Sequence, residues 1–255
     1  MKRREYYYII YRIVLVLILL VISILIINKN KNFKLTNVFA PTKELPIYSV
    51  ERDDKKIALT FDAAYGDEYT LDILDTLDKY NIKSTFFLVK FWMDRYPHQV
   101  IEIHNRGHEI GNHSATHPNM STLSKEQIEQ ELNSTGDKIY ELTKERPLLF
   151  RPPFGDYNDL LIQISRDNGY YAIQWDIDSL DWKNLGVLPV VDTVIRNINS
   201  GSIVLFHNNA DYIIEYLPIV IQRLLENGYE IVPVSELIYY DNFRMDNSGR
   251  QIRIK

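Results

Sequence analysis

The residues of this chain best suited to chemistry lie in five short stretches. Together the stretches supply carboxylates, an arginine and three histidines, and the first, third and fifth each close an apolar run of strand type. A carboxylate and a histidine can remove a proton from water and return one to a leaving group. The set therefore predicts a hydrolytic site. In chain order the stretches are Thr60-Phe61-Asp62, His113-Ser114-Ala115-Thr116-His117, Arg151-Pro152-Pro153-Phe154-Gly155, Asp178-Ser179-Leu180-Asp181-Trp182 and Leu205-Phe206-His207.

His113 and His117 have the spacing of a metal-binding pair. On a helical turn, residues four apart present both imidazoles on one side, within reach of one cation. The alternative is a pair of surface or capping histidines. Asp62, at the end of a predicted strand, adds a carboxylate, and two imidazoles with one carboxylate suit zinc as well as cobalt or nickel.

Asp62 and Arg151 each end a predicted strand. We interpret Asp62 as a general base that deprotonates water, and Arg151, stiffened by the two prolines that follow it, as the guanidinium that orients Asp62 and lowers its pKa. The alternatives are a turn aspartate at a strand end and a purely structural ion pair.

His207 closes the very apolar run 203–206, where a lone histidine is commonly a core residue. Asp181 offers it a partner that would keep the imidazole protonated enough to act as a general acid. Trp182, next in the chain, is either a core side chain or a flat wall for a sugar ring.

Strand and helix patterns alternate from Ile57 onward, which predicts a parallel sheet. About seven β/α units favour a barrel over an open doubly wound sheet, although both folds place their chemistry at the carboxyl ends of the strands. We expect strands near 57–61, 84–89, 109–112, 148–151, 171–177, 202–207 and 230–234, and helices near 69–80, 92–105, 159–168, 190–199 and 214–227, with one more that starts at a capping box of Ser124 and Gln127.

The N-terminus carries a different signal. The run Ile13–Ile27 contains only Ile, Val and Leu apart from Ser23. It is somewhat shorter than the ~20 residues that cross a bilayer, but Arg12 can reach the interface. We predict a transmembrane anchor within residues 1–28. The alternative is a cleaved signal peptide, for which the sequence offers a poor cleavage site.

Composition excludes several classes. The net charge of −5 gives no basic footprint for nucleic acid, and the absence of cysteine excludes disulfides and zinc–thiolate sites. For the rest of the chain we expect a linker over 29–55, a catalytic domain over 56–240 and a flexible polar tail over 241–255.

Taken together, the five stretches resemble the motifs of the polysaccharide deacetylases, carbohydrate esterase family 4, also called the nodulation-type deacetylase homology domain. T-F-D, H-S-x-x-H-P, R-P-P-F-G, D-S-L-D-W and L-F-H stand in family order, and Gly107–Ser114 also fits. The resemblance covers roughly Lys56–Ile238 and is strongest to membrane-anchored clostridial and sporulation-associated members.

This resemblance implies a distorted, TIM-barrel-like (β/α)7 barrel. It also implies metal-assisted removal of N-acetyl groups from the amino sugars of a cell-wall polysaccharide such as peptidoglycan, with zinc as the metal. A cell-wall substrate and a retained anchor together predict a single-pass membrane protein with its catalytic domain outside the cytoplasm. The implied roles are Asp62 as base, Arg151 as its holder, His113 and His117 as metal ligands, the Phe154 N–H as oxyanion donor, His207 as acid tuned by Asp181, and Leu205 and Trp182 as walls of the acetyl pocket and sugar groove.

One position departs from the family. The first motif usually has a second aspartate as third metal ligand, and here that residue is Ala63. Asp67 is the candidate replacement because Gly66 lets the backbone turn, and Glu68 has the longer reach. The alternative is that both acids cap the helix that follows. Two other functions therefore stay open: a catalytically weakened glycan-binding homologue, and a deacylase of another acetylated substrate.

Overall fold

The structure is a computed structural model that describes residues 11, 14–18, 20–21 and 43–254. The chain divides into two compact units, Met1–Thr42 and Lys43–Lys255. In the first unit the described residues are helical and exposed. Much of the run Ile13–Ile27, where we expect the anchor, lies outside the described residues. None of the helices described is long and apolar enough to cross a membrane.

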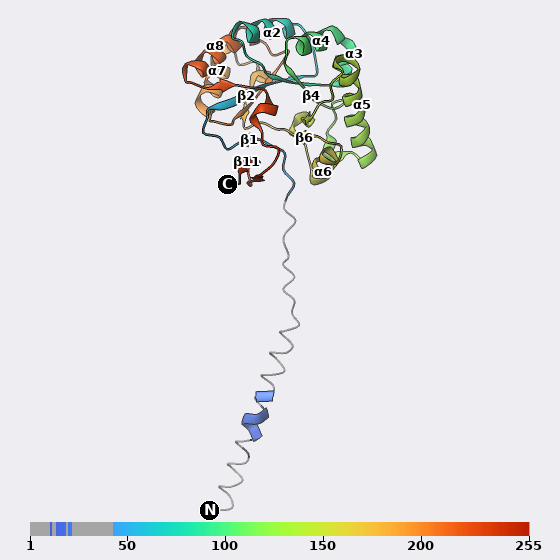
Figure 1. The fold of residues 1–255 in the computed structure, drawn as a ribbon, viewed down its shortest axis with the longest axis vertical. Helices are drawn as coiled ribbons and strands as arrows, with labels where there is room; N and C mark the ends of the chain where they lie inside the picture. Colours follow the sequence, from blue (N-terminus) through green and yellow to red (C-terminus); the bar gives the residue numbers. More distant parts are fainter. Residues whose placement is uncertain (1–10, 12–13, 19, 22–42, 255) are drawn as a thin grey trace, which may run out of the picture. The chain divides into compact units, whose positions relative to one another are not determined.

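The second unit is built on one parallel sheet (Figure 1). Seven strands follow in the order β6-β5-β4-β3-β2-β8-β7, and β9 pairs with β2 outside this order. No pairing between β6 and β7 is found among the described residues, so the sheet is that of a distorted barrel left open between them. The strands are β2 (Lys56–Ala63), β3 (Thr85–Leu88), β4 (Glu109–Asn112), β5 (Leu149–Phe150), β6 (Tyr171–Ala172), β7 (Ile177–Asp178), β8 (Ile203–His207) and β9 (Glu230–Ile231).

Alternation along β2 separates the core from the site. Ile57, Leu59, Phe61 and Ala63 belong to the largest apolar cluster, which the helices share. Because successive side chains of a strand point to opposite faces, Thr60 and Asp62 lie on the other face. The helices are α2 (Thr70–Lys79), α3 (Lys90–Arg95), α4 (Pro97–Asn105), α5 (Lys125–Thr143), α6 (Asp159–Asp167), α7 (Val187–Asn197), α8 (Ile213–Glu226) and α9 (Val234–Leu237), with 3-10 turns η1 (Met120–Thr122), η2 (Pro153–Gly155) and η3 (Asp181–Lys183).

Two helix predictions have different outcomes. The capping box of Ser124 and Gln127 is present at the start of α5, as predicted. The single helix expected over 92–105 is instead two helices, α3 and α4, which meet at Tyr96. Pro97 is the first residue of α4, a position where no helical N–H is needed. The same missing N–H prevents α3 from continuing through residue 97.

The described parts of the expected linker and tail fold onto this unit. A second sheet joins β1 (Ser49–Val50), β11 (Arg250–Arg253) and β10 (Phe243–Met245), with β1 parallel to β11. The buried amide of Gln251 donates to the Tyr239 carbonyl and accepts from the Tyr239 N–H, both at 2.8 Å. The folded unit thus begins at Lys43 and runs through Ile254, beyond the expected bounds of 56 and 240 on both sides.

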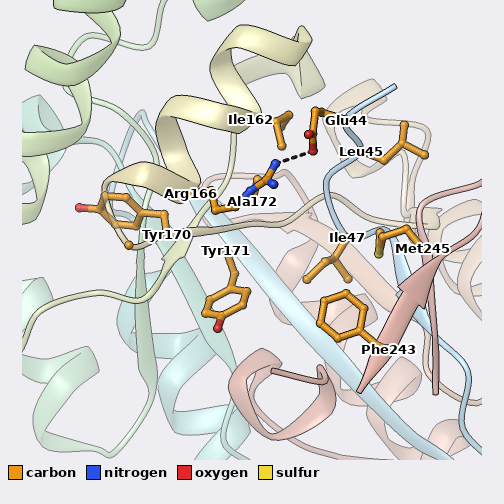
Figure 2. Close-up of a pocket in the computed structure, with 11 residues that line it drawn as sticks. Glu44, Leu45, Ile47, Ile162, Arg166, Tyr170, Tyr171, Ala172, Phe243 and Met245 are labelled. Carbon is orange, nitrogen blue, oxygen red and sulfur yellow. Dashed lines mark hydrogen bonds and ion pairs between the residues drawn. The ribbon is translucent and has the colours of Figure 1, made fainter. Parts of the chain in front are cut away.

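Figure 2 shows a cavity of about 400 Å³ that these added segments help to form. Glu44 pairs with Arg166 of α6 across it, while Ile47 and Met245 line it from the two ends of the folded unit. None of the predicted catalytic residues lines this cavity.

Candidate active site

The site lies where the carboxyl ends of the strands meet. In the parallel pairing of β2 with β8, Asp62 stands opposite His207. Asp181 and Trp182 lie in η3, just after β7, and the histidine stretch begins where β4 ends. Because parallel strands end at one edge, five stretches far apart in sequence are brought to a single place.

Asp62 and Arg151 form a buried ion pair. Nη1 of Arg151 lies 2.7 Å from Oδ1 of Asp62 and 2.9 Å from Oγ1 of Thr60, and Nη2 donates to the Gln174 carbonyl at 3.1 Å. The guanidinium also stacks 4.1 Å from the Phe87 ring centroid. Burial is the largest single influence and would raise the pKa of the Asp62 carboxyl, but the charge and hydrogen bond of Arg151, together with His113 and His207, outweigh it and lower that pKa. The carboxylate therefore stays ionised, as a general base must.

His113 is fixed by the backbone of Arg151. Its Nδ1 lies 2.8 Å from the Arg151 carbonyl, which can only accept, so Nδ1 carries the proton. This leaves the lone pair on Nε2, which lies 3.4 Å from Oδ2 of Asp62. Burial lowers the pKa of His113, and it lowers that of His117 to about 4. Both imidazoles are therefore neutral at pH 7, the form that binds metals.

The two histidines are not on a helical turn, so that prediction is wrong. In a helix, the N–H of residue 118 would bond to the Ser114 carbonyl, but residue 118 is a proline without an N–H. The segment bends instead, with Ser114 and His117 at φ of 70° and 57°. Glu131 of α5 supports the bend by accepting from the N–H groups of Ala115 and Thr116 at 2.7 and 2.8 Å.

The ring spacing of the histidine pair matches that of a pair bound to one divalent cation, but no third ligand stands beside the pair among the described residues. Two imidazoles bound to a tetrahedral cation through ~2.0 Å bonds have ring centroids roughly 5 Å apart. Those of His113 and His117 lie 5.0 Å apart at an interplanar angle of 72°. Oδ2 of Asp67 accepts from Gln99 at 3.0 Å. The described residues contain no group of three or more histidines or acids arranged to hold a metal, so Asp67 is not brought to the pair.

His207 and Asp181 form the expected pair. Nδ1 of His207 lies 2.7 Å from Oδ1 of Asp181, while Oδ2 accepts from the His207 N–H at 2.8 Å and from the Tyr216 hydroxyl at 3.0 Å. Burial alone would lower the pKa of His207, but the hydrogen bond and charge of Asp181 raise it above its ordinary value. The imidazole thus keeps a proton near neutral pH and can donate it.

The remaining predicted residues lie around this centre. Phe154 sits in η2 with a left-handed backbone (φ 59°), and its exposed ring stands 4.4 Å from the ring centroid of His117. Leu205 is buried on β8, two residues before His207, while Trp182 is exposed on η3. An exposed tryptophan next to Asp181 can serve as a wall of the site.

Several residues of the site were not predicted. Thr60 shares a strand face with Asp62, so the period of two could have indicated it. Gln174 acts through its backbone carbonyl, Tyr216 reads as a core residue of an apolar helix, and Glu131 reads as one acid among several on α5. None of these three carries a sequence signal for its role.

Comparison with known proteins identifies the family of this chain. Residues 49–173 match the family model described as "Polysaccharide deacetylase". A peptidoglycan-N-acetylglucosamine deacetylase of Bacillus cereus is 37% identical over 198 residues, which cover 76% of this chain and 92% of that protein. The peptidoglycan-N-acetylmuramic acid deacetylase PdaA of Bacillus subtilis is 31% identical, with 75% of this chain and 74% of that protein covered.

Solved structures give the same result. The Bacillus subtilis PdaA structure, of a family 4 carbohydrate esterase, superposes with a TM-score of 0.72 at 30% identity, covering 75% of this chain and 84% of that chain. A CE4 family pseudoenzyme from Bacillus anthracis superposes with a TM-score of 0.74 at 32% identity, covering 83% of this chain and 73% of that chain. The chain belongs to the polysaccharide deacetylase family.

Proposed function

We propose that this protein hydrolyses the N-acetyl groups of amino sugars in peptidoglycan. The observation that carries the proposal is the placement of an ionised carboxylate and a histidine of raised pKa opposite each other on neighbouring strands. Two relatives that align with about three quarters of the chain are named as deacetylases of N-acetylated peptidoglycan sugars, which supports the substrate class.

The residues divide the reaction into two proton transfers. Asp62 takes a proton from the water that attacks the acetamide carbonyl, while Arg151 holds its carboxylate in place. The carbonyl carbon becomes tetrahedral with a negative oxygen. The resemblance of Arg151–Gly155 to the family motif assigns the stabilisation of this oxygen to the N–H of Phe154. His207 then protonates the sugar nitrogen as the C–N bond breaks. The products are acetate and a free amine, which adds positive charge to the glycan at neutral pH.

His113 and His117 are the residues that would hold a divalent cation, for which we propose zinc. When bound, such a cation polarises the carbonyl oxygen as a Lewis acid. With two protein ligands the remaining positions fall to water or substrate, so we expect weaker binding than at a three-ligand site.

A second candidate is a homologue whose catalysis is weakened and which chiefly binds glycan. Ala63 at the position of the usual ligand and the similarity to a pseudoenzyme favour it. The complete pairing of Asp62 with Arg151 and of His207 with Asp181 argues for retained catalysis.

Acetate release tests the proposal. The substrates are N-acetylglucosamine oligomers, intact peptidoglycan and acetylated xylan, each with and without a chelator, and the Asp62→Asn protein is the matched control. We expect acetate from the first two substrates and none from the control. Glycan binding without acetate release would support the second candidate, and release from xylan alone would support a deacylase of another substrate.

We further propose that Ile13–Ile27 remains attached as a single-pass anchor, with the folded unit outside the cytoplasm. The support is the apolar composition of this run and the place of the substrate. N-terminal sequencing of the mature protein and protease treatment of intact spheroplasts test it. A mature chain that begins near residue 30, or a folded unit protected from protease, would contradict the proposal.

A further inference from the structure

Two exposed aromatic side chains extend the site beyond the residues that do its chemistry. Tyr65, just after β2, and Phe91, in the first turn of α3, are 62% and 38% exposed, yet their ring centroids lie only 5.7 Å apart. The ring centroid of Tyr65 lies 6.2 Å from that of His117, which also lies 5.0 Å from His113 and 4.4 Å from Phe154. A continuous row of rings therefore runs from the histidines outward.

Buried side chains hold the loop that carries Tyr65. The carbonyl of Gly66 accepts from Nε1 of Trp92 at 2.6 Å and from Nδ2 of Asn208 at 2.9 Å, and Asp67 accepts from Gln99. Trp92, Asn208 and Gln99 are all buried. Gly66 itself has φ of 60°, a backbone conformation that favours glycine. An exposed ring on a loop this firmly held is preorganised for contact with a ligand.

The residues just before Phe91 are hydrogen-bonded to the backbone of two segments that carry site residues. The N–H of Lys90 donates to the Ser114 carbonyl at 3.1 Å, and that of Val89 donates to the Ala63 carbonyl at 3.1 Å. The chain continues from β3 to Phe91 and from β2 to Tyr65. It continues from β7 to Trp182, and in the sheet order β8, which carries His207, lies between β2 and β7. Along the sheet, His207 thus lies between Trp182 and the Tyr65–Phe91 pair, and Asp62 ends the strand that leads to Tyr65.

We propose that Tyr65 and Phe91 form a second carbohydrate subsite, which binds a sugar ring of the same glycan strand next to the sugar that is deacetylated. The inference rests on the proposed function, because a polymeric substrate must continue out of the site. The C–H groups on a pyranose face carry partial positive charge and match the negative face of an aromatic ring. A sugar stacked here makes longer oligomers better substrates than short ones.

The test compares acetate release from N-acetylglucosamine oligomers of two to six units. Wild-type kcat/KM should rise with length, and Tyr65→Ala and Phe91→Ala should each lower it about fivefold to tenfold for the long oligomers, chiefly through KM, and less for the disaccharide. Tyr65→Phe, which keeps the ring, should retain most of the length dependence. Tyr140→Ala removes an equally exposed aromatic from α5 and is the matched control, with no effect at any length expected.

Binding separates failure of the subsite from failure of the proposed function. The affinity for the N-acetylglucosamine hexamer is measured by calorimetry. The proteins compared are the Asp62→Asn variant and the double variants that add Tyr65→Ala or Phe91→Ala to it. Weaker binding in the double variants supports the subsite even if the wild-type protein releases no acetate, a result that would overturn only the deacetylase proposal. Unchanged hexamer binding, or a loss of activity equal at every oligomer length, would overturn the subsite, the latter because Tyr65 would then only support His117.

Discussion

The two halves of the site are held in different ways. The proton-transfer half consists of Asp62 with Arg151 and His207 with Asp181, and strands β2 and β8 fix the distance between its two pairs. The cation half consists of His113 and His117 on a bent loop, and Ala63 stands where the family has a further ligand. Strand register and buried charge pairs are sensitive to any change of side chain, whereas the affinity of the proposed two-histidine site for a cation should respond to single added ligands.

The largest effect is expected from Asp62→Asn, which removes the base. General base contributions are ~10²–10⁴-fold, and kcat for acetate release should fall by about that factor. The substitution also leaves the buried Arg151 guanidinium without its counter-charge, so the melting temperature should fall as well. Activity near wild type in the folded variant would show that Asp62 is not the base. The division of the site into a proton-transfer half and a cation half would then be wrong.

Asp181→Asn and Tyr216→Phe should shift the pH profile in opposite directions. Asp181 raises the pKa of His207, and the acid works only while protonated, so activity is lost as pH rises through that pKa. Without the Asp181 charge the loss begins at lower pH. Without the Tyr216 hydroxyl the carboxylate is less neutralised, holds the proton on His207 more firmly, and the loss begins at higher pH. Profiles of kcat/KM against pH that move together would contradict the assignment of His207 as the acid.

Ala63→Asp should sharpen the contrast by completing the cation half. Ala63 is the last residue of β2, at the edge of the sheet where the site lies, although its own side chain packs in the apolar cluster on the face opposite Asp62. An added carboxylate should tighten zinc binding by about tenfold or more, measured by competition with a chromophoric chelator. Thermal unfolding is the control, since Ala63 also touches the apolar cluster. Lower stability with unchanged zinc affinity would mean that the carboxylate enters the core instead.

Asp67→Ala should have the smallest effect on metal binding. The carboxylate of Asp67 is held by Gln99 and its carbonyl accepts from Thr70 at the start of α2, so its contacts are structural. Zinc affinity should equal that of the wild type, while His113→Ala, measured beside it, should abolish binding. A clear loss of zinc affinity in Asp67→Ala would show that this loop rearranges to supply the missing ligand.

The sequence predicts the parts of this molecule that follow a repeating pattern. The alternation of strands and helices, the capping box before α5 and the placement of Asp62, Arg151 and His207 at strand ends all have a period or a fixed spacing. Contacts made by backbone atoms have no such pattern, which is why the Gln174 carbonyl was not predicted. The spacing of His113 and His117 predicted a helical turn, but the missing N–H of Pro118 prevents that turn altogether.

The three-stranded sheet of β1, β11 and β10 has a consequence for folding during synthesis. Its parallel pair joins the first strand of the folded unit, β1, to the last, β11, and the Val50 N–H is held by Gly201 at 2.9 Å. A chain that emerges from the ribosome, or through a membrane channel, therefore cannot form this pair until β11 has emerged. Contacts so distant in sequence also form late and slowly. The small sheet is thus expected to form after the main sheet, and the edge of β1 stays available to chaperones and export factors until β11 is in place.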